Sequence, residues 1–512
     1  MLVKVYAAAV HGISAIKVTI EVNCSKGIQF LLVGLADAAV RESHERIISA
    51  LQVCNYKIPR NRIVINMAPA DIRKEGASYD LPLAIGILAA TEQIDSSRLE
   101  KFMIMGELSL DGSLKPVRGV LPIAIQAKAD GFEGIILPRE NAKEAAVVND
   151  FKVYGVDSLK EVIEFIDGKK DLEPVCMNIR EEFHNQQQFF EYDFSEVRGQ
   201  ENVKRALEVA AAGGHNLLMI GPPGSGKSML AKRLPSILPP FSMEESLETT
   251  KIHSVAGKLG SSTSLMVQRP FRSPHHTISN VAMVGGGSSP QPGEISLAHN
   301  GVLFLDELPE FNRNVLEVMR QPLEDRMINV SRARFTVDYP AGFMLIASMN
   351  PCPCGYYNHP DRPCLCAPGT VQKYMNRISG PLLDRIDLHI EIVPVPFEKI
   401  SERRPSEQSI AVRERVVRAR AIQEERFRDH KGIYCNAQMS TKLLHKYATP
   451  DADGLARLKT AMERLNLSAR AYDRILKVSR TIADLAGAEN IETAHIAEAI
   501  NYRNLDRETW GM

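Results

Sequence analysis

The sequence predicts an α/β protein in three parts, two of mixed strands and helices and a third that is helical. In the first part, residues 62–66 are typical of a strand and residues 38–53 of a helix. In the second, the apolar run 216–220 is followed by a glycine-rich loop and then by a helical pattern. From Ser406 to Asn504 the apolar residues keep helical spacing, with only brief turns.

The boundaries follow from changes in composition along the chain. Residues 1–168 form the first predicted domain, and the charged, glutamine-containing stretch 169–191 is a predicted linker. Residues 192–395 form the second domain. Prolines and arginines between 394 and 405 mark a hinge, and residues 406–512 form the helical third domain.

Composition restricts the compartment and the partners. No apolar run reaches the roughly 18 residues of a membrane helix, and the start of the chain lacks the apolar core of a signal peptide. We therefore expect a cytoplasmic protein with no membrane partner. Lys plus Arg and Asp plus Glu are equal at 62 each, so any nucleic-acid binding must depend on local basic patches.

A phosphate-binding loop follows the apolar run 216–220. It has the sequence Gly221-Pro222-Pro223-Gly224-Ser225-Gly226-Lys227-Ser228. Glycines let backbone N–H groups converge on phosphate, Lys227 reaches the β- and γ-oxygens, and the Ser228 hydroxyl binds Mg²⁺. ATP and Mg²⁺ are the predicted cofactors.

Two later strands add catalytic groups. The apolar run 301–305 ends in Asp306 and Glu307, where Asp306 can hold the Mg²⁺ shell and Glu307 can polarise the attacking water. The strand 343–348 leads to Asn350, placed to hydrogen-bond the γ-phosphate or that water. Together with the phosphate loop, these residues predict nucleotide hydrolysis.

Four of the eight cysteines form a cluster just after Asn350. Cys352, Cys354, Cys364 and Cys366 follow a C-x-C, nine-residue, C-x-C pattern. Four thiolates at this spacing can close around one structural Zn²⁺ and order a loop that has little apolar content. His359 can replace one ligand, and the alternative is reduced thiols in a loop.

The first domain resembles the proteolytic domain of the Lon family over its second half. The resemblance lies in Lys74-Glu75-Gly76-Ala77-Ser78, the helix 81–90 and the run 106–112, and it puts Ser78 at the nucleophile position. The position of the catalytic lysine is taken by Leu121, with Lys115 and Lys128 off the motif. Because a serine nucleophile needs a base, we expect a pseudo-protease that serves as a structural or interaction module.

The second and third domains carry a wider family resemblance. The phosphate loop, a long insertion, Asp306-Glu307, a hairpin, Asn350 and the run Leu382-Leu383-Asp384-Arg385-Ile386-Asp387 resemble the AAA+ branch of magnesium chelatase ATPase subunits and MCM helicases. With the Lon-like segment and the run 269–276, almost the whole chain resembles the ComM/YifB family of magnesium-chelatase-like ATPases. This implies an AAA+ core, an S5-like N-terminal α/β domain and a C-terminal helical lid.

The resemblance also implies residue roles and an assembly. Arg385 would be an arginine finger for a neighbouring subunit and Arg470 the sensor of the lid; Arg377 is the second choice for the finger. A surface pairing of Arg385 with Asp384 or Asp387 is the alternative. A finger that acts in trans implies a ring, a homohexamer in this family.

A ring has a pore in which basic hairpins can grip DNA phosphates. The candidate contacts are Arg332 and Arg334 on the predicted hairpin, and Lys258, His275 and His276 in the insertion. The alternative is that they are solvated loop charges.

Four functions remain open from the sequence. The resemblance implies an ATP-driven helicase or translocase on single-stranded or branched DNA, associated with natural transformation and branch migration. The alternatives are a chelatase-like protein remodeller, an ATP-dependent protease, which Leu121 disfavours, and a nucleotide-regulated scaffold, which Glu307 disfavours.

Overall fold

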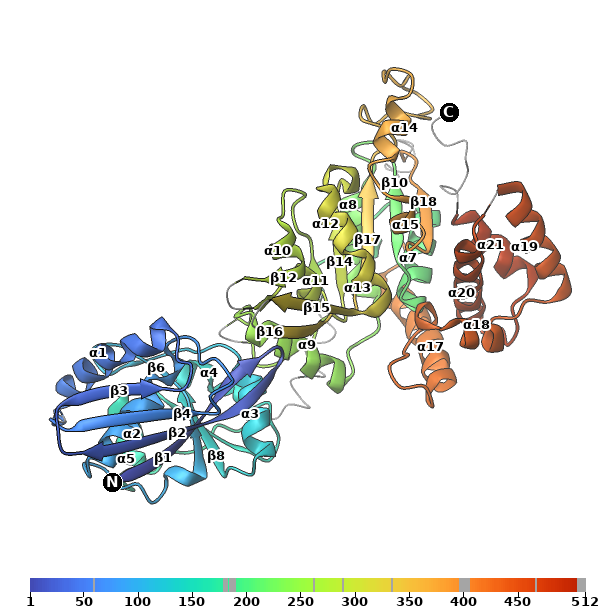
Figure 1. Ribbon diagram of the computed structural model, residues 1–512. Coiled ribbons are helices and arrows are strands. Elements are labelled where there is room, and N and C mark those ends of the chain that lie inside the picture. Colours follow the sequence, from blue (N-terminus) through green and yellow to red (C-terminus); the bar gives the residue numbers. More distant parts are fainter. Residues whose placement is uncertain are drawn as a thin grey trace. The chain divides into compact units, whose positions relative to one another are not determined.

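The computed structural model of the protein is shown in Figure 1. It describes residues 1–503 except 59, 178–182, 184–189, 261–262, 288–289, 333–334, 396–405 and 466. The chain forms two compact units. Unit 1 comprises residues 1–186 and 243–267, and unit 2 comprises residues 187–242 and 268–512. Residues 243–267, which the sequence places in the nucleotide core, therefore belong with the N-terminal unit.

Unit 1 is built on a mixed seven-stranded sheet. The strand order is β3 (Gln29–Val33), β4 (Arg62–Ala68), β2 (Ser14–Ser25), β1 (Leu2–His11), β5 (Phe102–Ile104), β8 (Gly134–Pro138) and β9 (Lys152–Val156). The pairs β1–β2 and β2–β4 are antiparallel, whereas the other neighbouring strands are parallel. Alternate residues of β4 are buried, as expected for a sheet with one face against a core.

The helices of unit 1 pack on this sheet and on one another. They are α1 (Ala38–Val53), α2 (Asp80–Ala90), α3 (Val120–Ala129), α4 (Arg139–Ala145), α5 (Leu159–Ile166) and α9 (Met243–Val255). The Asp37 carboxylate caps α1 by accepting from the Val40 N–H at 2.8 Å. Every residue of α2 is buried. The end of α9 is tied to the start of α3, since the Gly119 N–H donates to the Ser254 carbonyl at 3.2 Å.

Unit 2 contains a five-stranded parallel sheet. Its order is β11 (Phe271–Arg272), β14 (Val302–Leu305), β17 (Met344–Met349), β10 (Leu217–Ile220) and β18 (Leu388–Glu391). All residues of β10, β14 and β17 are buried, which explains why these strands are continuous apolar runs. Because parallel strands end at the same edge, the segments that follow these three strands meet there.

Shorter elements surround this sheet. The helices are α7 (Glu201–Gly213), α8 (Lys227–Arg233), α10 (Asn280–Val284), α11 (Glu294–Leu297), α12 (Arg313–Val318), α13 (Arg320–Asp325), α14 (Thr370–Met375) and α15 (Gly380–Leu383). β15 (Met327–Arg332) and β16 (Phe335–Pro340) form the predicted antiparallel hairpin, and β12 (Gly285–Gly286) pairs with β13 (Gln291–Pro292).

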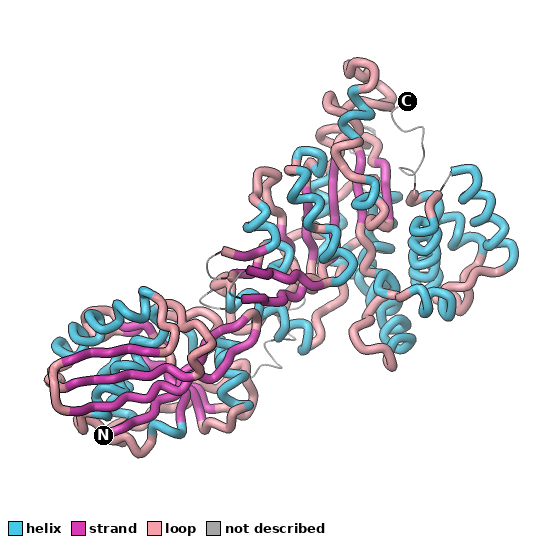
Figure 2. The backbone as a smooth tube through the Cα atoms, in the orientation of Figure 1, coloured by secondary structure: helices cyan, strands magenta, loops and turns pink. Residues whose placement is uncertain are grey.

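The C-terminal part of unit 2 consists of helices and loops, as Figure 2 shows. They are α17 (Ser409–Phe427), α18 (Thr441–Tyr447), α19 (Ala452–Leu465), α20 (Ala469–Ala486) and α21 (Thr493–Asn501). Apolar residues of α17 and α20 share one hydrophobic core with α7 and the sheet. None of the helices in the described part of the chain has the length and apolar character needed to cross a bilayer.

The sequence of α17 carries Arg413, Arg415, Arg418 and Arg420, and such a run is usually a solvated helix face. Three of these arginines instead contact the nucleotide core. Arg413 donates to the Leu238 carbonyl at 3.1 Å, Arg415 pairs with Glu208 at 2.5 Å, and Arg420 donates to the Ala211 carbonyl at 2.9 Å. The solvated-face interpretation is therefore wrong for these three side chains. They attach the helical part to the nucleotide core.

Candidate nucleotide-hydrolysis site

The phosphate loop lies between β10 and α8, as its sequence predicts. Gly224 and Gly226 have φ angles of +77° and +89°, a region that favours glycine. The Lys227 ammonium donates to the carbonyls of Gly221 at 2.7 Å and Pro222 at 2.9 Å. Its burial lowers the pKa of Lys227. The lysine is thus held directly across the loop that would cradle phosphate.

The groups predicted to bind Mg²⁺ lie close together. The Ser228 hydroxyl donates to Asp306 Oδ2 at 2.6 Å, which joins the start of α8 to the end of β14. The Ser348 hydroxyl on β17 donates to the other oxygen, Asp306 Oδ1. Hydroxyl and carboxylate oxygens are the ligands that Mg²⁺ prefers, so these residues fit the predicted Mg²⁺ shell.

Glu307 follows in a left-handed backbone conformation with φ of +55°. Its side chain is 56% exposed, and its Oε2 lies 3.7 Å from His276 Nδ1. The centroid of the His276 ring lies 4.1 Å from that of the tilted His275 ring and 6.4 Å from that of Phe311, which it meets edge to face. A histidine predicted to contact DNA therefore lies beside the predicted catalytic carboxylate.

Asn350 closes the site from the end of β17. Its Oδ1 accepts from Lys227 Nζ at 3.2 Å. Tyr374 on α14 is buried, and this burial raises the pKa of Tyr374 to about 12. The four predicted groups Lys227, Asp306, Glu307 and Asn350 thus belong to one edge of the sheet.

The three candidate arginines have different surroundings. Arg385 is 7% exposed, and its guanidinium pairs with Glu324 on α13 at 2.7 Å rather than with Asp384 or Asp387. Arg470 is 62% exposed and lies 3.6 Å from Asp384. Arg377 is 54% exposed and pairs with Glu310 at 2.9 Å. Within one chain, Arg385 is a buried, paired cation.

Asp387 has a separate role in joining the core to the lid. It is buried, and it pairs with Arg474 of α20 at 2.9 Å and with His215 at 3.5 Å. The His215 ring in turn hydrogen-bonds Thr481 of the same helix at 2.8 Å. This network fixes α20 to the segment that carries Arg385.

The predicted DNA contacts are divided between the two units. Lys258 belongs to unit 1, whereas His275 and His276 belong to unit 2. Arg332 ends β15, but its side chain, like the whole of Arg334, lies outside the described residues. His275 Nδ1 is 2.9 Å from the Thr277 hydroxyl.

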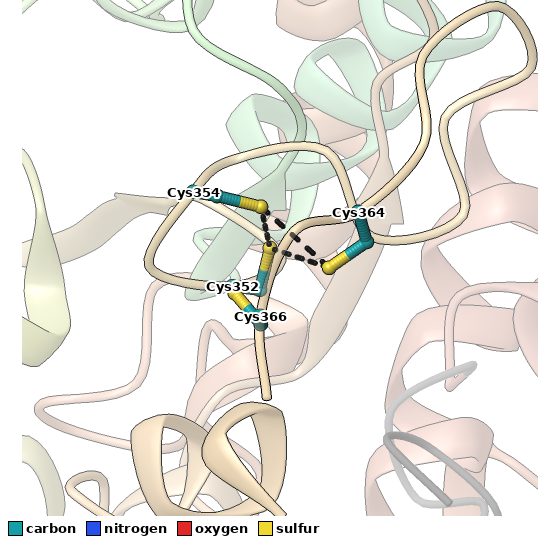
Figure 3. A group of neighbouring side chains, drawn as sticks. All are labelled: Cys352, Cys354, Cys364 and Cys366. Atoms are coloured by element: carbon teal, nitrogen blue, oxygen red, sulfur yellow. Dashed lines mark hydrogen bonds between the residues drawn. The ribbon is translucent and has the colours of Figure 1, made fainter. Parts of the chain in front are cut away.

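The four cysteine sulfurs lie within 4.8 Å of one another (Figure 3). The Sγ atoms of Cys352 and Cys354 are 3.3 Å apart, and both are within 3.7 Å of Cys364 Sγ. Sulfurs at about 2.3 Å from a tetrahedral Zn²⁺ lie roughly 3.8 Å apart, so the cluster fits such an ion. His359 is not among these ligands; its Nδ1 accepts from the Asp361 N–H.

The sulfurs of Cys352 and Cys354 have different environments. Burial and hydrogen bonding with Cys354 raise the pKa of Cys352 to about 12. Burial acts in the same direction on Cys354, but backbone N–H groups of Tyr356 and Leu365 donate to it and lower the pKa of Cys354 to about 6. Donation of backbone N–H groups to sulfur stabilises the charged form that binds metal.

The Lon-like position has no base at the expected place. Ser78 lies in a short 3-10 helix, Ala77–Tyr79, and its carbonyl accepts from the Gly106 N–H at 2.9 Å. Leu121 is fully buried on α3, and its N–H donates to Glu144 at 2.9 Å. A buried leucine has no proton to exchange, so the predicted pseudo-protease fits this geometry.

Sequence reasoning missed several residues of the site. Ser348 precedes Asn350 by two positions in a strand pattern, so alternation could have placed both on one face. His276 and Glu324 carry no such signal, because their partners Glu307 and Arg385 are far away in the sequence.

Comparison with known proteins agrees with these features. Family models described as "Magnesium chelatase, subunit ChlI", "Subunit ChlI of Mg-chelatase" and "Magnesium chelatase, subunit ChlI C-terminal" match residues 193–400, 20–141 and 406–503. A stretch of 125 residues is 30% identical to Lon protease 2 of Bacillus subtilis, covering 24% of this chain and 22% of that protein.

Two relatives match over nearly the full length. Competence protein ComM of Haemophilus influenzae is 44% identical over 508 residues, which is 98% of this chain and 97% of that protein. The uncharacterized protein YifB of Salmonella typhimurium is 45% identical over 509 residues, with the same coverage. The chain, with its AAA-like parallel-sheet core, Lon-like N-terminal domain and helical C-terminal region, therefore belongs to the ComM/YifB family of magnesium-chelatase-like proteins.

Proposed function

We propose that this protein is an ATP-driven, ring-forming DNA helicase or translocase that promotes branch migration during the integration of transforming DNA. Membership of the family implies ATPase activity, with ATP and Mg²⁺ as cofactors. The observation that carries the proposal is the convergence of Lys227, Asp306, Glu307 and Asn350 at one sheet edge. The coupling to DNA is supported by the full-length similarity to a protein named for competence.

Hydrolysis in this proposal proceeds without a covalent intermediate. Ser228 and Asp306 would hold Mg²⁺, Lys227 and Asn350 would contact the γ-phosphate, and Glu307 would orient and deprotonate the attacking water. His276 lies 3.7 Å from Glu307 and restricts where that carboxylate points. Mg²⁺, when bound, would neutralise charge on the phosphates.

The ring completes the site between subunits, in this proposal as a homohexamer. Arg385 acts in trans on the neighbour's γ-phosphate, and Arg470 senses nucleotide from the lid. Since Arg385 pairs with Glu324 within its own chain, we infer that assembly replaces this ion pair with one to phosphate. Such an exchange would make the finger available only where a neighbour is present.

The decisive experiment measures ATPase rate alone and with single-stranded, duplex or four-way-junction DNA. We expect stimulation by single-stranded or branched DNA, and movement of a labelled junction that depends on ATP. An ATPase rate that does not respond to any DNA would contradict the DNA function while leaving the nucleotide site intact.

A chelatase-like protein remodeller is the second candidate, because family models for ChlI match three separate parts of the chain. It predicts the opposite response in the same assay. ATPase activity would then rise with a protein partner and stay unchanged with DNA.

A further inference from the structure

The four-cysteine loop is in direct contact with the nucleotide site. It starts two residues after Asn350, whose Oδ1 accepts from Lys227 at 3.2 Å. It ends at α14, which carries the buried Tyr374. The loop therefore begins beside the residue that contacts Lys227.

The middle of the loop touches the phosphate loop. Gly355 has a φ of +85°, and a Cβ at this position would lie 2.5 Å from Pro223 Cδ and 2.8 Å from Pro223 Cγ. The turn that brings Gly355 there is closed by its own N–H, which donates to the Cys352 carbonyl at 2.9 Å. The first cysteine of the cluster thus fixes the residue that contacts Pro223.

The loop buries little apolar surface of its own. Between β17 and α14 it contains no helix or strand among the described residues, and Cys352, Pro351 and Gly355 are its buried positions. Leu365, between two of the cysteines, is 83% exposed. A segment that buries so little apolar surface needs another source of order, and a structural metal supplies it.

We propose that a zinc ion bound by Cys352, Cys354, Cys364 and Cys366 holds Gly355 against Pro223 and Asn350 against Lys227, so that zinc occupancy sets nucleotide affinity. The proposal rests on the nucleotide site of the proposed function, but it does not depend on DNA. The four sulfurs are within 4.8 Å of one another, and binding releases the thiol protons to solvent. Zinc acts here as a structural clamp on the phosphate loop and has no open position for substrate.

The test uses the full-length protein in three forms besides the wild type. Cys354→Ser removes a ligand. Gly355→Ala leaves all four thiolates but places a methyl group on Pro223. Cys176→Ser is the matched control, since Cys176 is an exposed cysteine outside the cluster. The zinc content per chain is measured by elemental mass spectrometry. Nucleotide affinity is measured by titration with a fluorescent ADP analogue.

We expect one zinc per chain in the wild type, the Cys176→Ser variant and the Gly355→Ala variant, and none in Cys354→Ser. Nucleotide affinity should fall about tenfold in Cys354→Ser and in Gly355→Ala and stay unchanged in Cys176→Ser. Removing zinc from the wild type with a chelator should reproduce the loss, and added Zn²⁺, but not Mg²⁺, should restore the affinity.

Two results would overturn the proposal. A wild-type protein that contains no zinc, or that has Cys352 and Cys354 joined in a disulfide, would show that no zinc ion holds this loop. Zinc in the wild type together with unchanged nucleotide affinity in both Cys354→Ser and Gly355→Ala would show that the clamp and the nucleotide site are independent. Neither result bears on stimulation by DNA, so the proposed function is tested separately.

Discussion

At the scale of single residues, the nucleotide site is a set of hydrogen bonds between side chains from different strands. Asp306 accepts from Ser228 and Ser348, and Lys227 donates to Asn350 and to the loop carbonyls. In the proposed mechanism, binding of nucleotide depends on Lys227, and cleavage of the terminal phosphate depends on the neighbouring Glu307. Variants at Lys227 and Glu307 should therefore separate the two steps.

We predict that Lys227→Ala loses nucleotide affinity, whereas Glu307→Gln binds ATP without hydrolysing it. The first change removes the ammonium that we expect to contact the phosphates, whereas the second keeps the phosphate cradle and removes the expected base. Binding is measured by equilibrium titration and turnover by phosphate release. Turnover of Glu307→Gln at the wild-type rate would show that another group activates the water.

We also predict that His276→Ala lowers kcat about tenfold with little change in nucleotide affinity. A general base contributes roughly 10²–10⁴-fold to the rate, and without His276 the Glu307 carboxylate would be less well oriented for that role. The 3.7 Å contact between His276 and Glu307 is the basis for this expectation. The control is His445→Ala, an exposed histidine on α18. If His276→Ala instead changed DNA affinity with kcat intact, the original assignment of His276 to DNA would hold.

At the scale of elements, the hairpin β15–β16 is held by pairing between its own two strands, whereas the helix α20 is held by side-chain contacts with the core. Six residue pairs join β15 to β16 in antiparallel register from Met327 to Arg332. The helix α20 is fixed by the buried network of Arg474, Asp387 and His215. The strand β15 ends at Arg332, and the other arginine predicted to contact DNA, Arg334, follows two positions later.

If the hairpin grips DNA, the double change Arg332→Ala with Arg334→Ala should weaken binding equally across sequences and lower the slope of log K against log salt by about two. Basal ATPase should survive, because neither residue belongs to the nucleotide site. Arg428→Ala, on an exposed arginine that pairs with Glu425, is the control. If the salt slope were unchanged and the variant still moved junctions, the hairpin would not bind DNA, and Lys258 and His275 would be the next candidate contacts.

At the scale of the whole molecule, the active form is proposed to be a ring whose sites lie between subunits. The site uses Lys227 of one subunit and Arg385 of the next. Two inactive variants with lesions on opposite sides of that boundary can therefore complement each other, whereas lesions on the same side cannot.

We predict that equal amounts of Arg385→Ala and Lys227→Ala subunits restore activity, since random mixing leaves about a quarter of the interfaces with both intact residues. Mixing Lys227→Ala with Glu307→Gln should restore none, because both lesions lie on the same side of the boundary. ATPase rate is followed across mixing ratios, with mixed rings verified by mass. Mixed rings without recovery at any ratio would exclude Arg385 as the finger and leave Arg377 as the candidate.

The sequence by itself determined the features that depend on neighbouring residues or on strand ends. The phosphate loop is eight consecutive residues, and Asp306 and Asn350 follow buried strands whose carboxyl ends must meet in a parallel sheet. The cysteine cluster was also predictable, because all four ligands lie within fifteen residues of one another.

Only the tertiary structure decided which side chains from distant segments meet. It placed His276 beside Glu307, paired Arg385 with Glu324, set Gly355 on Pro223 and joined residues 243–267 to the N-terminal unit. Periodicity reports which face of an element is buried but not which element covers it. These contacts arise from packing between elements far apart in the chain, so no local pattern records them.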